Sequence, residues 1–195
     1  MEQLEFLDSL SLREKKKYSD MPETWKLKPL CCLSDVSEEE VYYAVSEGDK
    51  GSDWAVLRHP PLAFELYLLN KKGEQTFYFK KHAGLFSDKL EIFNASEDRL
   101  GSVQKQRSPK TKIQFQTMDA GGRALYGIEG RLEDLETFHI LQGAVTVGKI
   151  SKRPTPIVDE GISRKDHFGI VFPLAADTTE KGVLLGALFL IDLMF

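Results

Sequence analysis

Residues 182–191 read Gly-Val-Leu-Leu-Gly-Ala-Leu-Phe-Leu-Ile, and this run of apolar and glycine residues is interrupted only at Asp192. A helix with this sequence is apolar on every face and must be surrounded by something. Spanning a bilayer takes about 20 apolar residues, whereas runs of about 10–14 more often form a core helix. We therefore expect a helix buried inside the protein, capped by Thr178 or Thr179 with Glu180 in its first turn. Insertion into a membrane is the alternative.

The chain before this run alternates apolar and polar residues with the period of two that is typical of strands. Residues 64–69 and 75–80 flank the turn Asn70-Lys71-Lys72-Gly73, which predicts a β-hairpin. The unit recurs about every 21–28 residues, as consecutive hairpins of a meander do. Further strands are expected at 41–45, 90–93, 100–105, 112–116, 124–128, 137–140 and 146–151. Because such a meander must protect its sheet edges, we predict an all-β dominated fold that closes into a barrel.

Length and composition indicate one globular domain, or one domain plus a tail. The chain has 195 residues, 42% hydrophobic and 29% charged, with a net charge of −4. That charge argues against nucleic acid as the main ligand. Leu4, Leu7 and Leu10 lie three apart, so we expect residues 1–24 to form a flexible or helical tail and residues 25–195 to form the barrel domain.

No motif predicts familiar catalysis. Residues 143–150 match the G-x-x-x-x-G-K phosphate loop, but Ile150 stands where a hydroxyl is needed and no helix follows. The histidines have no metal-ligand spacing, and no serine sits in a nucleophile elbow. Cys31 and Cys32 are adjacent and are expected to stay reduced, with acylation as the alternative. We expect no classical enzyme.

Basic residues gather in two places. Residues 99–112 hold five basic side chains and no acid, and a second cluster lies at 149–153. Basic clusters hold anionic lipid head groups with about 1 kcal/mol per charge, and an ordinary solvated face is the alternative. The candidate head-group ligands are Lys105, Arg107, Lys149, Lys152 and Arg153.

Asp166 and Asp177 flank the segment that leads into the apolar run. Calcium takes about 6–8 oxygen ligands, mostly from carboxylates and carbonyls, so these two aspartates are the candidate calcium ligands. The alternative is a strand followed by a proline-marked turn and the cap of the helix.

The C-terminal quarter resembles the phospholipid scramblases. The similarity rests on residues 148–152, on Asp-His-Phe-Gly-Ile-Val-Phe-Pro-Leu at 166–174 and on residues 185–195, and it extends more weakly back to residue 38. The resemblance implies a tubby-like fold, a barrel of about twelve strands threaded by the hydrophobic helix. It also implies energy-independent movement of phospholipids between membrane leaflets, stimulated by calcium.

Two departures from the family pattern bear on that function. Acids that the family's calcium segment carries at its first, third and last positions correspond here to Arg164, Asp166 and Ala175, so calcium binding should be weakened or absent. The family's acylated cysteine cluster would fall at residues 82–89, which contain no cysteine. Residues 148–157 resemble the family's nuclear-import segment, although Pro154 and Pro156 alter its second half.

Two hypotheses remain. The first is a scramblase-family protein at the cytoplasmic face of a membrane, with phospholipid as its partner, a degenerate calcium motif, and a nuclear or cytosolic pool. The second is a tubby-like module that does not transport lipid but binds anionic lipid or a protein partner.

Overall fold

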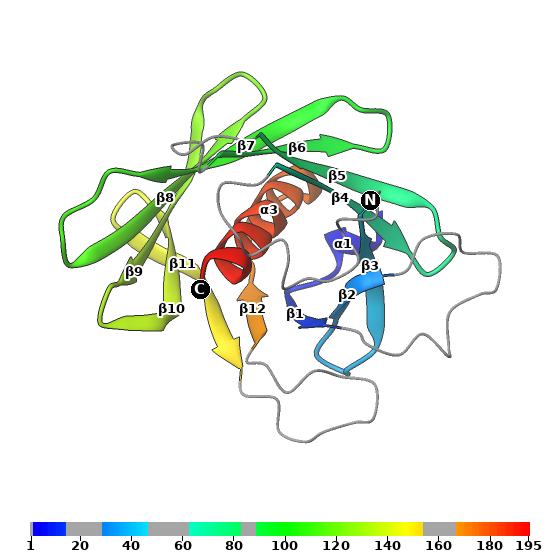
Figure 1. The fold of residues 1–195 in the computed structure, drawn as a ribbon, viewed down its shortest axis with the longest axis horizontal. Helices are drawn as coiled ribbons and strands as arrows, with labels where there is room; N and C mark the ends of the chain where they lie inside the picture. The colour runs from blue at the N-terminus through cyan, green and yellow to red at the C-terminus, as the bar shows by residue number, and fades with distance from the viewer. Residues whose placement is uncertain (1, 15–28, 47–62, 83–88, 154–166) are drawn as a thin grey trace.

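The fold is described from a computed structural model, which places residues 2–14, 29–46, 63–82, 89–153 and 167–195. These ranges contain twelve strands that form one closed antiparallel barrel around a C-terminal helix (Figure 1). The strands are β1 (Ser9–Glu14), β2 (Pro29–Ser34), β3 (Glu40–Val45), β4 (Phe64–Asn70), β5 (Gln75–Lys81), β6 (Lys89–Asn94), β7 (Arg99–Gln106), β8 (Lys112–Asp119), β9 (Ala124–Arg131), β10 (Asp134–Gln142), β11 (Val145–Arg153) and β12 (His167–Val171). The helices are α1 (Glu2–Glu5) and α3 (Thr178–Met194).

The strands follow one another around the wall in chain order, and β1 closes the circle between β12 and β2. The predicted hairpins are all present as β4–β5, β6–β7, β8–β9 and β10–β11. The closed barrel of about twelve strands around the helix is therefore confirmed, and with it the tubby-like architecture.

Four hairpin turns share one chemical solution. Each begins with Asp35, Asn70, Asn94 or Asp119, whose side-chain oxygen accepts hydrogen bonds from backbone N–H groups further along the same turn. The fourth position takes a positive φ, which glycine adopts freely at 73 and 122. Asp and Asn are favoured at such positions because their short side chains replace missing backbone partners. All four turns lie at the end of the barrel where α3 begins.

The expected N-terminal tail is wrong for residues 9–14, and residues 15–24 lie outside the described residues. Leu10 and Leu12 are buried in β1, and Ser9 to Ser11 pair with β12 while Ser11 to Glu14 pair with β2. The threefold spacing of leucines indicated a helix, but Ser9 to Leu12 also alternate polar and apolar residues. Pairing with β2 and β12 favours the strand alternation over the helical spacing, because α3 needs one more strand to cover it.

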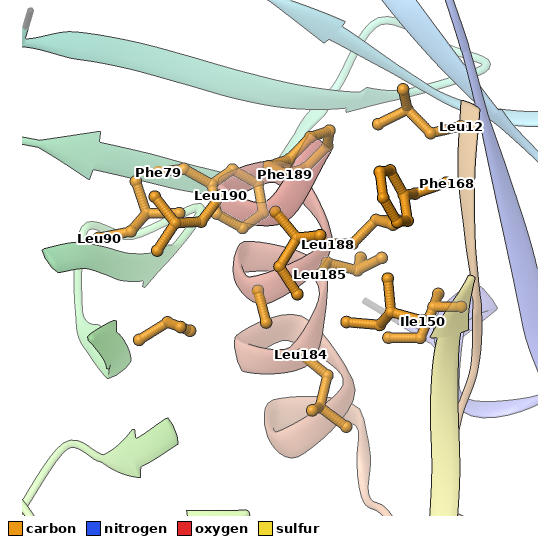
Figure 2. Packing of buried hydrophobic residues seen from close by; sticks show 14 of the residues in the cluster. Leu12, Phe79, Leu90, Ile150, Phe168, Leu184, Leu185, Leu188, Phe189 and Leu190 are labelled. Atoms are coloured by element: carbon orange, nitrogen blue, oxygen red, sulfur yellow. The ribbon is translucent and has the colours of Figure 1, made fainter. Parts of the chain in front are cut away.

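Helix α3 fills the barrel. Every residue from Lys181 to Leu193 is buried, which confirms the predicted core helix. Phe189 packs against Phe79 with ring centroids 5.0 Å apart, while Phe168 and Ile150 lie on the other side of the helix (Figure 2). Within the described ranges, no helix has the length and hydropathy that crossing a bilayer would take.

The helix cap differs from the expectation. The N-cap residue is Asp177 rather than Thr178 or Thr179, and its carboxylate accepts a hydrogen bond of 2.8 Å from the backbone N–H of Glu180. The Glu180 side chain reaches back to the N–H of Asp177, which completes a capping box. Glu180 also accepts a hydrogen bond from the Tyr126 hydroxyl, so this cap is tied to β9.

Glycines let the wall and the helix approach each other closely. A Cβ on Gly101 would lie 2.2 Å from the carbonyl oxygen of Met118 and 2.8 Å from Cγ2 of Val183 on α3. A Cβ on Gly182 would lie 2.4 Å from the Phe77 ring. The glycines inside the strands thus mark close backbone approach, as strand glycines often do.

We expect Gly101→Ala to lower the free energy of unfolding by about 1–3 kcal/mol, because the added methyl group meets a backbone oxygen that cannot rotate away. Urea denaturation followed by circular dichroism measures the change. Gly121→Ala is the matched control, since its Cβ would lie 3.4 Å from the nearest atom, a side-chain oxygen of Asp119. Equal midpoints for the two variants would contradict the packing described above.

Candidate functional site: two basic groups at one end of the barrel

The two ends of the barrel differ in charge. We call the end where α3 begins the acidic end and define it by residues 4–8, 35–39, 70–74, 94–98, 119–123 and 172–177. These segments carry ten carboxylates and three basic side chains, so this end repels anions. The opposite end, where β7 and β11 finish, is the basic end, and residues 105–112 there hold four basic side chains and no acid.

The register divides the expected head-group ligands into two groups. Lys105 and Arg107 lie at the end of β7 and just beyond it, whereas Lys149, Lys152 and Arg153 belong to β11. Three strands, β8, β9 and β10, separate β7 from β11 in the wall. Four strand spacings of about 4.8 Å place the groups roughly 19 Å apart along the wall. The structure therefore does not bring the five residues into one site.

The group after β7 presents its charges on a fixed turn. Arg107 and Lys110 are exposed. The Ser108 hydroxyl donates to the carbonyl of Lys112 at 2.7 Å, and the Leu132 N–H donates to the carbonyl of Thr111 at 3.0 Å. Within the described ranges, neither Arg107 nor Lys110 forms an ion pair. Both cations are therefore available to an external anion.

Lys112 in the same run is already engaged. Its ammonium lies 2.6 Å from Oε1 of Glu129, and Gln114 donates to the other carboxylate oxygen at 2.9 Å. The hydrogen bonds from Lys112 and Gln114 lower the pKa of Glu129. The Lys112 ammonium thus balances the negative charge of the Glu129 carboxylate on β9. It therefore contributes little to the binding of an external anion.

The group on β11 points in two directions. Lys149 is exposed, while the Lys152 ammonium lies 5.5 Å from the centre of the Phe168 ring and 3.4 Å from the Phe195 carbonyl oxygen. Residues an odd number apart in a strand face opposite sides, which explains the split. Lys152 therefore secures the end of α3, where a cation is favourable. The side chain of Arg153 lies outside the described part.

Sequence reasoning counted Lys110 in the basic run but did not select it as a ligand. Its availability depends on the turn that holds it, and in the described part of the chain it forms no ion pair. Charge along the chain cannot distinguish Lys110 from Lys112, because the acid that engages Lys112 is 17 residues away.

The described residues near the expected calcium segment do not fit a calcium ion. Asp177 is the N-cap of α3, so its carboxylate already holds a backbone N–H. Asp166 lies outside the described residues. Where side chains are placed, no three acidic, histidine or cysteine residues gather as metal ligands would. Asp177 alone supplies far fewer than the roughly 6–8 oxygens that calcium takes.

Cys31 and Cys32 lie in β2 as free thiols. Both side chains are buried, and the Cys32 sulfur contacts Oε1 of Glu40 at 3.4 Å. Acylation of the folded barrel would first require β2 to expose these sulfurs. Lipidation at these positions stays a prediction.

Comparison with known proteins identifies the family. A scramblase family model matches residues 32–195, which is most of the chain. The chain belongs to the scramblase family. This scramblase-family chain is 55% identical to human phospholipid scramblase 1 over 49 residues, which are 25% of this chain and 15% of that protein. It is 51% identical to bovine phospholipid scramblase 2 over 55 residues, which are 28% of this chain and 19% of that protein. The aligned part thus spans less than a fifth of either relative.

The fold has a relative among solved structures. The crystal structure of a protein from Arabidopsis thaliana matches with a TM-score of 0.50 over 93% of this chain and 91% of that one. The sequences are 10% identical, so this likeness concerns the fold alone.

We expect Asp177→Ala to lower the free energy of unfolding by about 1 kcal/mol, because the first turn of α3 loses its cap. Asp177→Asn should cost less, since asparagine also caps helices well. Urea denaturation with and without calcium measures both variants. Calcium that stabilised the parent chain but not Asp177→Asn would instead assign the carboxylate to the ion.

Proposed function

We propose that this scramblase-family chain binds anionic phospholipid at a membrane surface and moves phospholipids between leaflets without an energy source. The observation that carries the binding step is the pair of exposed cations Arg107 and Lys110, held on a fixed turn. Family membership supports the transport step. Such a protein is a lipid translocator rather than a classical enzyme.

The basic end is the side that would face the lipid. Each basic residue near an anionic surface contributes about 1 kcal/mol, so Arg107 and Lys110 together account for about 2 kcal/mol. Lys149 lies halfway along β11, opposite Val171, and is not at this end. The carboxylates at the acidic end are repelled by an anionic membrane, so the barrel would not bind with that end toward the lipid. Lys105, Lys152 and Arg153 lie near the same end, and we propose that they add to its positive field.

A second candidate function is a tubby-like module that binds anionic lipid or a protein partner without transporting lipid. The burial of α3 favours it, because the helix has no face left for a lipid chain or a polar head group. A polar group that crosses hydrocarbon without a partner costs several kcal/mol, so transport needs a path for head groups. Transport by this chain would therefore require the wall or the helix to rearrange.

We further propose that calcium has little effect on either function. Two of the three expected acidic positions hold Arg164 and Ala175, and Asp177 already caps α3. We also propose that the chain associates with the cytoplasmic side of a membrane and has a nuclear or cytosolic pool. Family membership is the support for this location.

Neutralising Arg107 and Lys110 should weaken binding to anionic vesicles. We expect Arg107→Gln/Lys110→Gln to raise the vesicle dissociation constant about 30-fold, the equivalent of about 2 kcal/mol for two charges. Co-sedimentation with vesicles of phosphatidylserine and phosphatidylcholine measures it. Lys72→Gln/Arg123→Gln is the matched control, with the same charge change at the acidic end. An equal loss in both pairs would show that net charge alone drives binding.

Reconstitution into liposomes separates the two candidate functions. We expect the chain to flip a fluorescent phospholipid, and the rate to be the same with calcium and with a chelator. Dithionite quenching of the outer leaflet measures the flipped fraction. Retained binding to anionic vesicles without flipping would contradict transport and support the second candidate function, a module that only binds. Strong stimulation of flipping by calcium would contradict the proposed loss of the calcium site.

A further inference from the structure

Two apolar side chains project from one corner of the acidic end. Phe6 is 81% exposed and Leu174 is 94% exposed, and both are far more exposed than the core residues beside them in the chain. They lie two residues to either side of a 2.9 Å hydrogen bond from the Phe172 N–H to the Asp8 carbonyl. We refer to them as the Phe6–Leu174 pair.

A buried lysine fixes the backbone on both sides of Phe6. Lys181 is 5% exposed, and its ammonium donates to the carbonyls of Leu4 at 3.3 Å, Glu5 at 2.8 Å and Leu7 at 3.0 Å. The Phe172 ring lies 5.7 Å from the same ammonium. Burying a charge is costly unless its donors are used, and here three carbonyls use them. The backbone around Phe6 is thus fixed by these hydrogen bonds, and the Phe6 side chain points into solvent.

Leu174 is held in the same way. Its neighbour Pro173 is buried, and Ala176, also buried, donates its N–H to the Pro173 carbonyl at 3.0 Å. The capped start of α3 follows at once. Burying a leucine or phenylalanine side chain is favourable, and the fixed backbone keeps both of these side chains in water in the folded chain.

The surface around the pair is acidic. Glu5, Asp8 and Asp177 are exposed, and residues 4–8 and 172–180 contain no lysine or arginine. The buried Lys181 ammonium is turned toward the carbonyls, and its positive charge offsets part of the charge of these carboxylates. An anionic membrane would be repelled here, whereas a cationic partner would be attracted.

We propose that the Phe6–Leu174 pair is the docking site for a basic amphipathic helix of a partner protein. Two residues of extended chain on each side, plus the backbone atoms joined by the hydrogen bond, place the two Cα atoms at most about 21 Å apart. A helix of about 14 residues is about 21 Å long and can contact both. Its apolar face covers the pair, and its flanking lysines and arginines meet Glu5, Asp8 and Asp177. This site does not depend on the proposed lipid function, since it lies at the opposite end of the barrel.

Binding of designed peptides to the full chain tests the site. The probe is a fluorescent 18-residue peptide of leucine and lysine with leucines on one helical face, compared with a leucine–glutamate and a serine–lysine peptide. We expect only the leucine–lysine peptide to bind, and Phe6→Ser/Leu174→Ser to weaken it at least tenfold by fluorescence anisotropy. Both changes are at exposed positions, so circular dichroism should show an unchanged fold.

Two controls make the result specific. Leu132→Ser, at a leucine that is 55% exposed at the basic end, should leave peptide binding unchanged. Glu5→Gln/Asp8→Asn should weaken binding and reduce its dependence on salt. Arg107→Gln/Lys110→Gln should leave it unaffected, which separates this site from the lipid site.

Several results would overturn the proposal. They are no binding of the leucine–lysine peptide, equal binding of the leucine–glutamate peptide, or binding that the Phe6–Leu174 pair does not affect. Loss of vesicle binding in Phe6→Ser/Leu174→Ser would instead assign the pair to a membrane. A change in its sedimentation coefficient would assign the pair to a second copy of the chain.

Discussion

The burial of an entirely apolar helix is the constraint on which the rest of this structure depends. Residues 182–191 of α3 expose apolar surface in every direction, so covering one face would leave most of the hydrophobic free energy unrealised. A closed wall of strands is the arrangement that covers all faces at once. It also pairs each of the twelve described strands on both sides, which protects their edges from aggregation.

The same constraint explains the details of the wall. The helix lies against glycines at positions such as Gly101, where a side chain would collide with it or with the neighbouring strand. It also draws β1 into the barrel, because without that strand the side of α3 near Leu12 would face water (Figure 2). Two buried charged residues, Lys181 and Asp192, lie near its two ends, and Lys181 joins the start of the helix to the N-terminal segment.

Because neighbouring strands run in opposite directions, acidic and basic segments that alternate along the chain lie at opposite ends of the barrel. Each hairpin turn with an Asp or Asn start falls at the acidic end, whereas the basic run after β7 falls at the other. The barrel thereby presents one end suited to anions and one suited to cations, although the net charge is only −4. A lipid surface and a basic partner protein could then be bound at the same time without competing.

The sequence by itself determined the hairpins, the buried helix and the closed barrel, because period, turn residues and apolar length are local signals. It did not determine β1, since Leu4, Leu7 and Leu10 suit a helix as well as Leu10 and Leu12 suit a strand, and only pairing with β2 and β12 selects between them. The cap at Asp177 was missed for a related reason, as neighbouring threonines cap equally well in isolation.

The candidate site was only partly predictable. The basic run at 105–112 is visible in the sequence, but the tertiary structure alone decided which of its charges are available. Lys112 of β8 is paired with Glu129 of the neighbouring strand β9, and Lys152 lies against Phe168, while Arg107 and Lys110 remain exposed. The availability of a charge depends on neighbours that are distant in the chain, because electrostatic interactions act through space over a few ångströms.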